Sequence, residues 1–337
     1  MNLRKLGAIA ALGLTTAFGA SAAVAGECGD ITIAEMNWAS AELLANVDKI
    51  ILEAGYGCNV EKVAGATMPT FTSMNEKGQP DIAPELWINA VRTPLEKAVA
   101  EGRMVVANEG PITGLGEGWW VTPAFVRDHP ELDTVEKVLE HPELFPWAED
   151  PSKGAFMGCP SGWGCQLANA NLFRAFNMEE KGWQLVDPGS AAGLDGAIAK
   201  AFERDENWFG YYWNPTAVVG KYHLTMLKWE TPWAGSDNWD NCIVKPEQEC
   251  ADPKPSSYTE SAVNSVVSAA FAEKGGEALD YVKNRVFPGE VMNEMLVYMT
   301  DNQATGEDAA YYFLENYEDV WKAWVSEDVA AKVKSAL

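Results

Sequence analysis

A tryptophan lies inside a short glycine-rich segment, GCPSGWGC, which begins at Gly158 and places two cysteines six positions apart. A bridge between Cys159 and Cys165 would hold Trp163 in one orientation, while the neighbouring glycines let the backbone approach a bound molecule. The face of an aromatic ring attracts a cation through its negative quadrupole. The segment therefore predicts a rigid aromatic wall for a cation, with a purely structural staple beside a core tryptophan as the alternative.

The same segment leads into a helix that we expect over residues 166–176. The first N–H groups of a helix have no partner within it and attract negative charge. We therefore expect the amides of Gly164 and Cys165 to form an anion site beside the aromatic wall.

The chain has six cysteines, an even number that suits disulfides in an exported protein. Proximity favours the pairs Cys28–Cys58, Cys159–Cys165 and Cys242–Cys250. A cysteine-ligated metal site is the competing interpretation, but the sequence has no Cys-x-x-Cys, and its three histidines lie far from the cysteines.

Residues 1–25 have the pattern of a secretory signal peptide: Arg4 and Lys5, an apolar stretch, and small residues before an expected cleavage after Ala25. A membrane anchor is the alternative, but the stretch is shorter than the ~20 apolar residues that span a bilayer. Glu27 argues against a lipid anchor on Cys28. We expect a soluble protein in the periplasm.

The formal charge of −24 opposes nucleic-acid binding, which needs basic surface to displace counterions. We expect a monomer. An enzyme, such as a periplasmic hydrolase or amine demethylase, is disfavoured because the sequence lacks a GxSxG elbow, an HExxH motif, a phosphate loop and a dinucleotide fingerprint. A binding protein fits better.

Strand-like and helix-like patterns alternate from residue 30 to residue 102 and again from residue 116 to Trp213. This alternation predicts an α/β fold with largely parallel sheets, and about 310 mature residues suffice for two domains. Ligands bind beyond the carboxyl ends of such strands, where Trp38 and Trp87 fall. Residues 260–274 and 319–336 are expected to form closing helices.

Three elements in this order, PELW at 84–87, GCPSGWGC at 158–165 and YYWNPT at 211–216, resemble the betaine-type substrate-binding proteins of ABC importers. The resemblance implies a type II, two-lobed fold with the ligand in the interlobe cleft and a membrane permease as partner. Lobe I would comprise residues 26–113 and 221–337, and lobe II residues 114–220.

In this family a tryptophan from each element surrounds a trimethylammonium group, which implies a box of Trp87, Trp163 and Trp213. Betaine carboxylates are held there by the amides that correspond to Gly164 and Cys165. A quaternary ammonium has no N–H to donate, so aromatic faces must recognise it.

One departure from the betaine pattern concerns the carboxylate. Val91 stands where betaine binders often carry a histidine, and Glu85 adds a negative charge near the box. Both changes favour trimethylamine N-oxide, with glycine betaine, choline or proline betaine as the alternatives. Glu85 could share a proton with the N-oxide oxygen, face the methyl groups, or be a surface or hinge carboxylate.

The segments EMNWASAE, APELW and GEGWW resemble the trimethylamine N-oxide-binding branch of the family. This resemblance adds Trp38 and either Trp119 or Trp120 as further walls of the box, with the core as the alternative place for Trp38. The remaining tryptophans, Trp239 among them, are interpreted as packing residues.

An acidic loop near the second cysteine pair could hold calcium through grouped carboxylates. Its spacing matches no EF-hand, and a solvated loop is the alternative. The candidate ligands are Asp237, Asp240, Glu247, Glu249 and Asp252.

Overall fold

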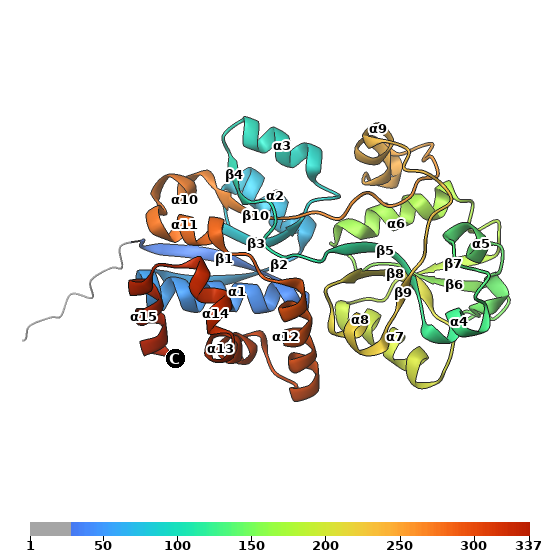
Figure 1. Ribbon diagram of the computed structural model, residues 1–337. Coiled ribbons are helices and arrows are strands. Elements are labelled where there is room, and N and C mark those ends of the chain that lie inside the picture. The colour runs from blue at the N-terminus through green and yellow to red at the C-terminus, as the bar shows by residue number, and fades with distance from the viewer. Residues whose placement is uncertain (1–27) are drawn as a thin grey trace, which may run out of the picture.

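The computed structural model describes residues 28–337, so the expected signal peptide at 1–25 lies outside the described residues. Two α/β lobes lie side by side, each built on its own five-stranded sheet (Figure 1). This is the type II two-lobed fold that the sequence predicts. None of the helices within residues 28–337 is long and apolar enough to cross a membrane.

The sheet of lobe I has the strand order β2-β1-β3-β10-β4. Its strands are β1 (Asp30–Met36), β2 (Asn59–Gly65), β3 (Ile82–Trp87), β4 (Met104–Asn108) and β10 (Val263–Ser268). β1 runs parallel to β2 and β3, whereas β10 runs antiparallel to β3 and β4. The prediction of a helix over 260–274 is therefore wrong in its first half, because the valine-rich segment Val263–Ser268 forms a fully buried strand within the sheet.

Three helices follow the first strands of lobe I: α1 (Ala39–Tyr56), α2 (Thr67–Lys77) and α3 (Arg92–Ala100). The C-terminal part adds α10 (Ala269–Lys274), α11 (Gly276–Asn284), α12 (Gly289–Asn302), α13 (Gly306–Asn316), α14 (Glu318–Trp321) and α15 (Glu327–Ala336). The apolar face of α1 packs against α13 and α15, which closes the core of this lobe.

The sheet of lobe II has the order β7-β6-β8-β5-β9. Its strands are β5 (Gly116–Val121), β6 (Gly154–Met157), β7 (Trp183–Val186), β8 (Phe209–Asn214) and β9 (Thr225–Met226). β9 pairs with β5, so this sheet extends past the boundary that was expected at residue 220. The helices of the lobe are α4 (Pro123–Asp128), α5 (Val135–Leu139), α6 (Gly164–Ala175), α7 (Ala191–Glu203) and α8 (Ala217–Tyr222).

Two segments connect the lobes, residues 109–115 between β4 and β5 and residues 227–262 between β9 and β10. The second is long and contains α9 (Ser236–Asn238), a π-helical turn (Trp239–Ile243) and a 3-10 turn (Glu247–Glu249). It passes beside α6 in Figure 1, and the Asn171 side chain on α6 donates to the carbonyls of Ile243 and Lys245. We call residues 227–262 the long connection.

The three expected disulfides are all present, Cys28–Cys58, Cys159–Cys165 and Cys242–Cys250. The first joins the start of β1 to the start of β2. The second closes the loop before α6, and the third closes a loop of the long connection. None of the cysteines in the described part of the chain is free.

A buried ion pair crosses the core of lobe I. Arg285 Nε lies 2.8 Å from Asp48 Oδ1, and both side chains are inaccessible to solvent. Tyr281 donates its hydroxyl to the same Asp48 oxygen at 2.6 Å, and Arg285 donates to the carbonyl of Pro84 in β3. The pair thereby links α1 and the C-terminal part to β3.

Replacing Asp48 with alanine should destabilise the protein by about 3–5 kcal/mol, because Arg285 would keep a buried charge without its partner. Urea unfolding of the mature protein measures this free energy. Asp280→Ala, which removes the exposed ion pair with Lys283, is the matched control and should change it by less than about 0.5 kcal/mol. Equal effects of the two substitutions would contradict the prediction.

Candidate functional site

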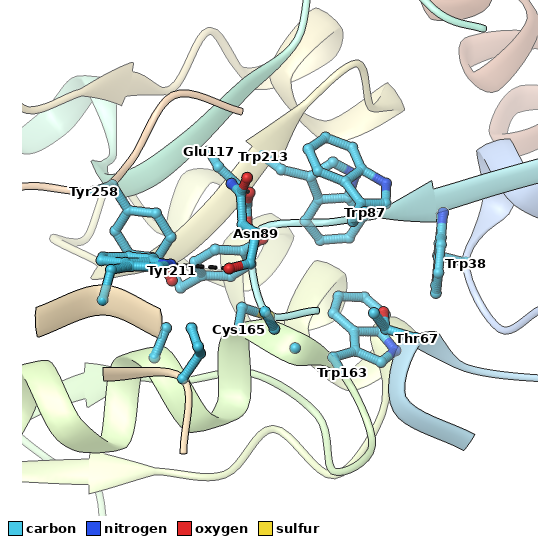
Figure 2. A pocket seen from close by; sticks show the side chains of 15 residues that line it. Trp38, Thr67, Trp87, Asn89, Glu117, Trp163, Cys165, Tyr211, Trp213 and Tyr258 are labelled. Carbon is cyan, nitrogen blue, oxygen red and sulfur yellow. Dashed lines mark hydrogen bonds between the residues drawn. The ribbon is translucent and has the colours of Figure 1, made fainter. Parts of the chain in front are cut away.

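A cavity lies between the lobes where the carboxyl ends of β1, β3 and β8 face the start of α6 (Figure 2). The empty space within it, its opening to solvent included, is about 470 Å³. Seven of the fifteen residues that line it are aromatic: Trp38, Trp87, Trp163, Trp213, Trp239, Tyr211 and Tyr258.

Four tryptophans that the sequence singles out line this cavity, and we call Trp38, Trp87, Trp163 and Trp213 the aromatic cage. Trp38 and Trp87 come from lobe I, and Trp163 and Trp213 from lobe II. Trp163 meets Trp38 edge to face at 5.5 Å between ring centroids and Trp213 at 5.0 Å. Perpendicular neighbouring rings form the walls of a box that can surround a compact group.

The loop before α6 holds Trp163 in place. The Cys159–Cys165 bridge closes this loop, whose Gly162 has a φ of +87°, a left-handed conformation that favours glycine. Across the cleft, Trp163 Nε1 donates to Asn37 Oδ1 at 2.8 Å. Trp163 is therefore oriented by its own loop and by lobe I.

Gly164 and Cys165 also line the cavity, at the first turn of the twelve-residue helix α6. A Cβ atom on Gly164 would lie 2.5 Å from the Cβ of Ala90, so only glycine lets the lobes approach this closely here. The start of α6 thus faces the cavity as the sequence predicts, with its positive dipole end toward any bound molecule.

Trp119 and Trp120 do not line the cavity, so the expectation that one of them forms a wall is wrong. Trp119 is buried in lobe II, where it packs 4.5 Å from Phe156 and donates to Asn169. The reason is the direction of β5, which is antiparallel to β8. The start of β5, not its tryptophans, lies beside the carboxyl end of β8.

Glu117 occupies that position, paired with Trp213 in the sheet, and it lines the cavity. Tyr211 donates its hydroxyl to Glu117 Oε1 at 2.7 Å, and Asn89 Nδ2 donates to Oε2 at 2.6 Å. Burial raises the pKa of Glu117 to about 7, against the lowering effect of these two donors. Figure 2 shows the three side chains together on one side of the cavity.

Sequence reasoning missed Glu117, although the GEGWW segment that contains it was singled out for its tryptophans. It also missed Trp239, which reaches the cavity from the long connection and donates Nε1 to the carbonyl of Asn89 at 2.9 Å. Nothing local in the sequence places Trp239 there, because its position depends on a contact 150 residues away.

Glu85 does not face the cavity. Its side chain is 0% exposed, and its Oε1 accepts hydrogen bonds from the indole N–H groups of Trp38 and Trp87. Burial raises its pKa to about 7, although the hydrogen bonds that it accepts oppose this shift. Glu85 is thus neither a surface carboxylate nor a cavity wall, and it holds two cage rings from behind.

The carboxylates proposed for calcium do not assemble. Within residues 28–337 no group of three or more acidic, histidine or cysteine side chains is arranged to hold a metal ion. Asp252 instead pairs with Lys254, and Asp237 accepts from Asn241. The five side chains Asp237, Asp240, Glu247, Glu249 and Asp252 therefore form no metal site in this loop.

The family model described as the substrate-binding domain of ABC-type glycine betaine transport systems matches residues 29–316. The chain belongs to this family. Its members are transport components rather than enzymes. A search of curated protein sequences found no match.

Solved structures show the same fold at low sequence identity. A choline-binding protein of an ABC transporter in complex with choline is 18% identical, with a TM-score of 0.70 over 92% of this chain and 98% of its own. A glycine betaine/L-proline-binding protein from Borrelia burgdorferi is 15% identical, with a TM-score of 0.70 over 90% and 99%. A lactococcal protein with bound glycine betaine is 18% identical, with a TM-score of 0.64 over 88% and 100%.

The stability of this family member should fall as the pH rises from about 5 to about 7. With the pKa of Glu117 raised from 4.5 to about 7, the folded state binds more protons than the unfolded state in this window. Glu117→Gln should remove about 2 kcal/mol of the loss within this window. Urea unfolding at several pH values within this window measures the free energy of unfolding. Glu149→Gln, which changes an exposed glutamate, is the control. A slope that Glu117→Gln leaves unchanged would refute the role of Glu117.

Proposed function

We propose that this protein is the periplasmic solute-binding component of an ABC importer and captures a small methylated amine between its lobes. The observation that carries the proposal is the aromatic cage with Glu117 in the same cavity and, among the described residues that line it, no lysine, arginine or histidine. Such a site attracts a cation that has no N–H to donate. The partner would be a membrane permease.

The strength of the cage suits capture of a dilute nutrient. Each desolvated ring face contributes up to about 2 kcal/mol, and each buried methyl group about 0.8 kcal/mol. Three of the four cage faces and three methyl groups together give a gross interaction of roughly 8 kcal/mol, which corresponds to about micromolar affinity before the cost of ordering the ligand and protein.

The family model and two structural neighbours are named for glycine betaine. We nevertheless take choline, which another neighbour binds, as the first candidate, because the charge of the cavity suits it. Its positive charge would be matched by ionised Glu117, and its hydroxyl could donate to a carboxylate oxygen. Glycine betaine is bound by another neighbour, and the positive dipole end of α6 would attract its carboxylate. However, its carboxylate would meet the negative charge of Glu117 without a basic side chain to offset it.

Trimethylamine N-oxide is the second candidate, and Glu117 favours it for a different reason. Because burial raises the pKa of Glu117 to about 7, part of the protein carries a protonated Glu117 at neutral pH. The N-oxide oxygen accepts but cannot donate, so protonated Glu117 would be its hydrogen-bond donor.

The two candidates predict opposite pH dependence. Choline needs ionised Glu117 and should bind more tightly as the pH rises through about 7, whereas the N-oxide needs protonated Glu117 and should bind more tightly as the pH falls through it. Calorimetry with choline, trimethylamine N-oxide and glycine betaine at several pH values decides between them. If glycine betaine binds most tightly at every pH, the assigned role of Glu117 is wrong.

Removing a cage ring should weaken binding of the preferred amine by more than about tenfold, the value of one desolvated ring face. Trp213→Ala is the test, and Trp233→Ala is the matched control because Trp233 is 48% exposed and lies outside the cavity. Titration calorimetry with either choline or the N-oxide measures the change. Unchanged affinity in Trp213→Ala would rule out the cage as the ligand site.

A further inference from the structure

A single carboxylate oxygen behind the cavity ties together the lobe I half of the cage. Glu85 Oε1 accepts from Trp38 Nε1 and Ser40 Oγ, both at 2.8 Å, and from Trp87 Nε1 at 2.9 Å. These donors come from the segment after β1 and from the end of β3. The edges of two cage rings are thus fixed by the same atom.

The fold alone does not explain a carboxylate at this position. Glu85 is inaccessible to solvent, and its Oε2 has no hydrogen-bond partner among the described residues. Burying a carboxylate with an unmatched oxygen destabilises the folded state relative to an apolar side chain. A residue that weakens the fold in this way is expected to serve the site instead.

The negative charge of Glu85 is not cancelled nearby. Arg285 is the charged side chain that lowers the pKa of Glu85, but its guanidinium already pairs with Asp48 at 2.8 Å. With Glu85 ionised, the buried side chains of Asp48, Arg285 and Glu85 together carry a net charge of −1. That charge lies directly behind Trp38 and Trp87.

We propose that Glu85 is a positioning residue that also gives the cage its charge: it aligns Trp38 and Trp87 and makes the site prefer a cation to a neutral molecule of the same shape. An anion that accepts an indole N–H polarises the ring and strengthens its attraction for a cation. The Coulomb attraction itself is weakly screened in a buried site. The inference rests on the proposed function, since it requires an ammonium group in the cage.

The test compares choline with dimethylbutanol, in which a carbon atom replaces the ammonium nitrogen. Glu85→Gln keeps the size of the side chain and an acceptor oxygen but removes the charge. By calorimetry at about pH 8, it should lower the affinity for choline by about tenfold and that for dimethylbutanol by less than about threefold. Equal losses for both ligands, or no loss for choline, would overturn the proposal.

Glu35→Gln is the matched control, because it makes the same change of charge on the neighbouring strand β1. Glu35 pairs with Lys62 at 2.7 Å and does not line the cavity. The choline affinity of this variant should stay within about twofold of the parent's, since a partly exposed pair is screened. A tenfold loss here would assign the effect to overall charge and overturn the role of Glu85.

Glu117→Gln provides a second measurement if Glu85→Gln does not fold. In that variant Glu85 remains as the carboxyl beside the cage whose pKa is raised to about 7. The ratio of choline to dimethylbutanol affinity should then rise with pH through about 7, and a flat ratio would overturn the proposal. Failure of the proposed function looks different, because the parent protein would bind none of choline, glycine betaine and trimethylamine N-oxide.

Discussion

Under the proposed function, the rest of the structure depends on the attraction between aromatic ring faces and a cation that offers no hydrogen bond. Such a cation is held by being surrounded, and one sheet edge presents rings from one side alone. The cage therefore draws Trp38 and Trp87 from lobe I and Trp163 and Trp213 from lobe II. The two lobes provide this enclosure, and the cavity between them lies where the carboxyl ends of the strands meet.

Desolvation sets the chemistry of the two carboxylates at the site. Glu117 and Glu85 sit on opposite lobes, and burial raises the pKa of each to about 7. Glu117 lines the cavity, and under the proposed function its protonation state selects the head group of the ligand. Glu85 lies behind two cage rings, and under our proposal it sets how strongly the cage prefers a cation.

The sequence predicts the α/β fold and part of the cage because those features depend on local patterns. Alternating strands and helices imply that strand ends converge, so Trp38 and Trp87 could be placed together. The two lobes and the places of Trp163 and Trp213 came from the resemblance to the family. Glu117 could not, since its position depends on the antiparallel register of β5 against β8. The period of two along a strand puts the Glu85 side chain on the same face of β3 as Trp87, two residues before the end of the strand. A short valine-rich run such as β10 fits a helix or a strand equally well until its neighbours are known.

The bond between Trp163 and Asn37 has a kinetic consequence. It spans the cleft, so the lobes cannot separate without releasing the indole N–H of a ring that also lines the cavity. A partly opened cleft therefore loses an interlobe contact and a wall of the cage in the same step. A molecule captured in the cavity would therefore leave when the lobes open, which also breaks the bond between Asn89 and Glu117. The time that it stays bound would be set by how often these interlobe contacts break together.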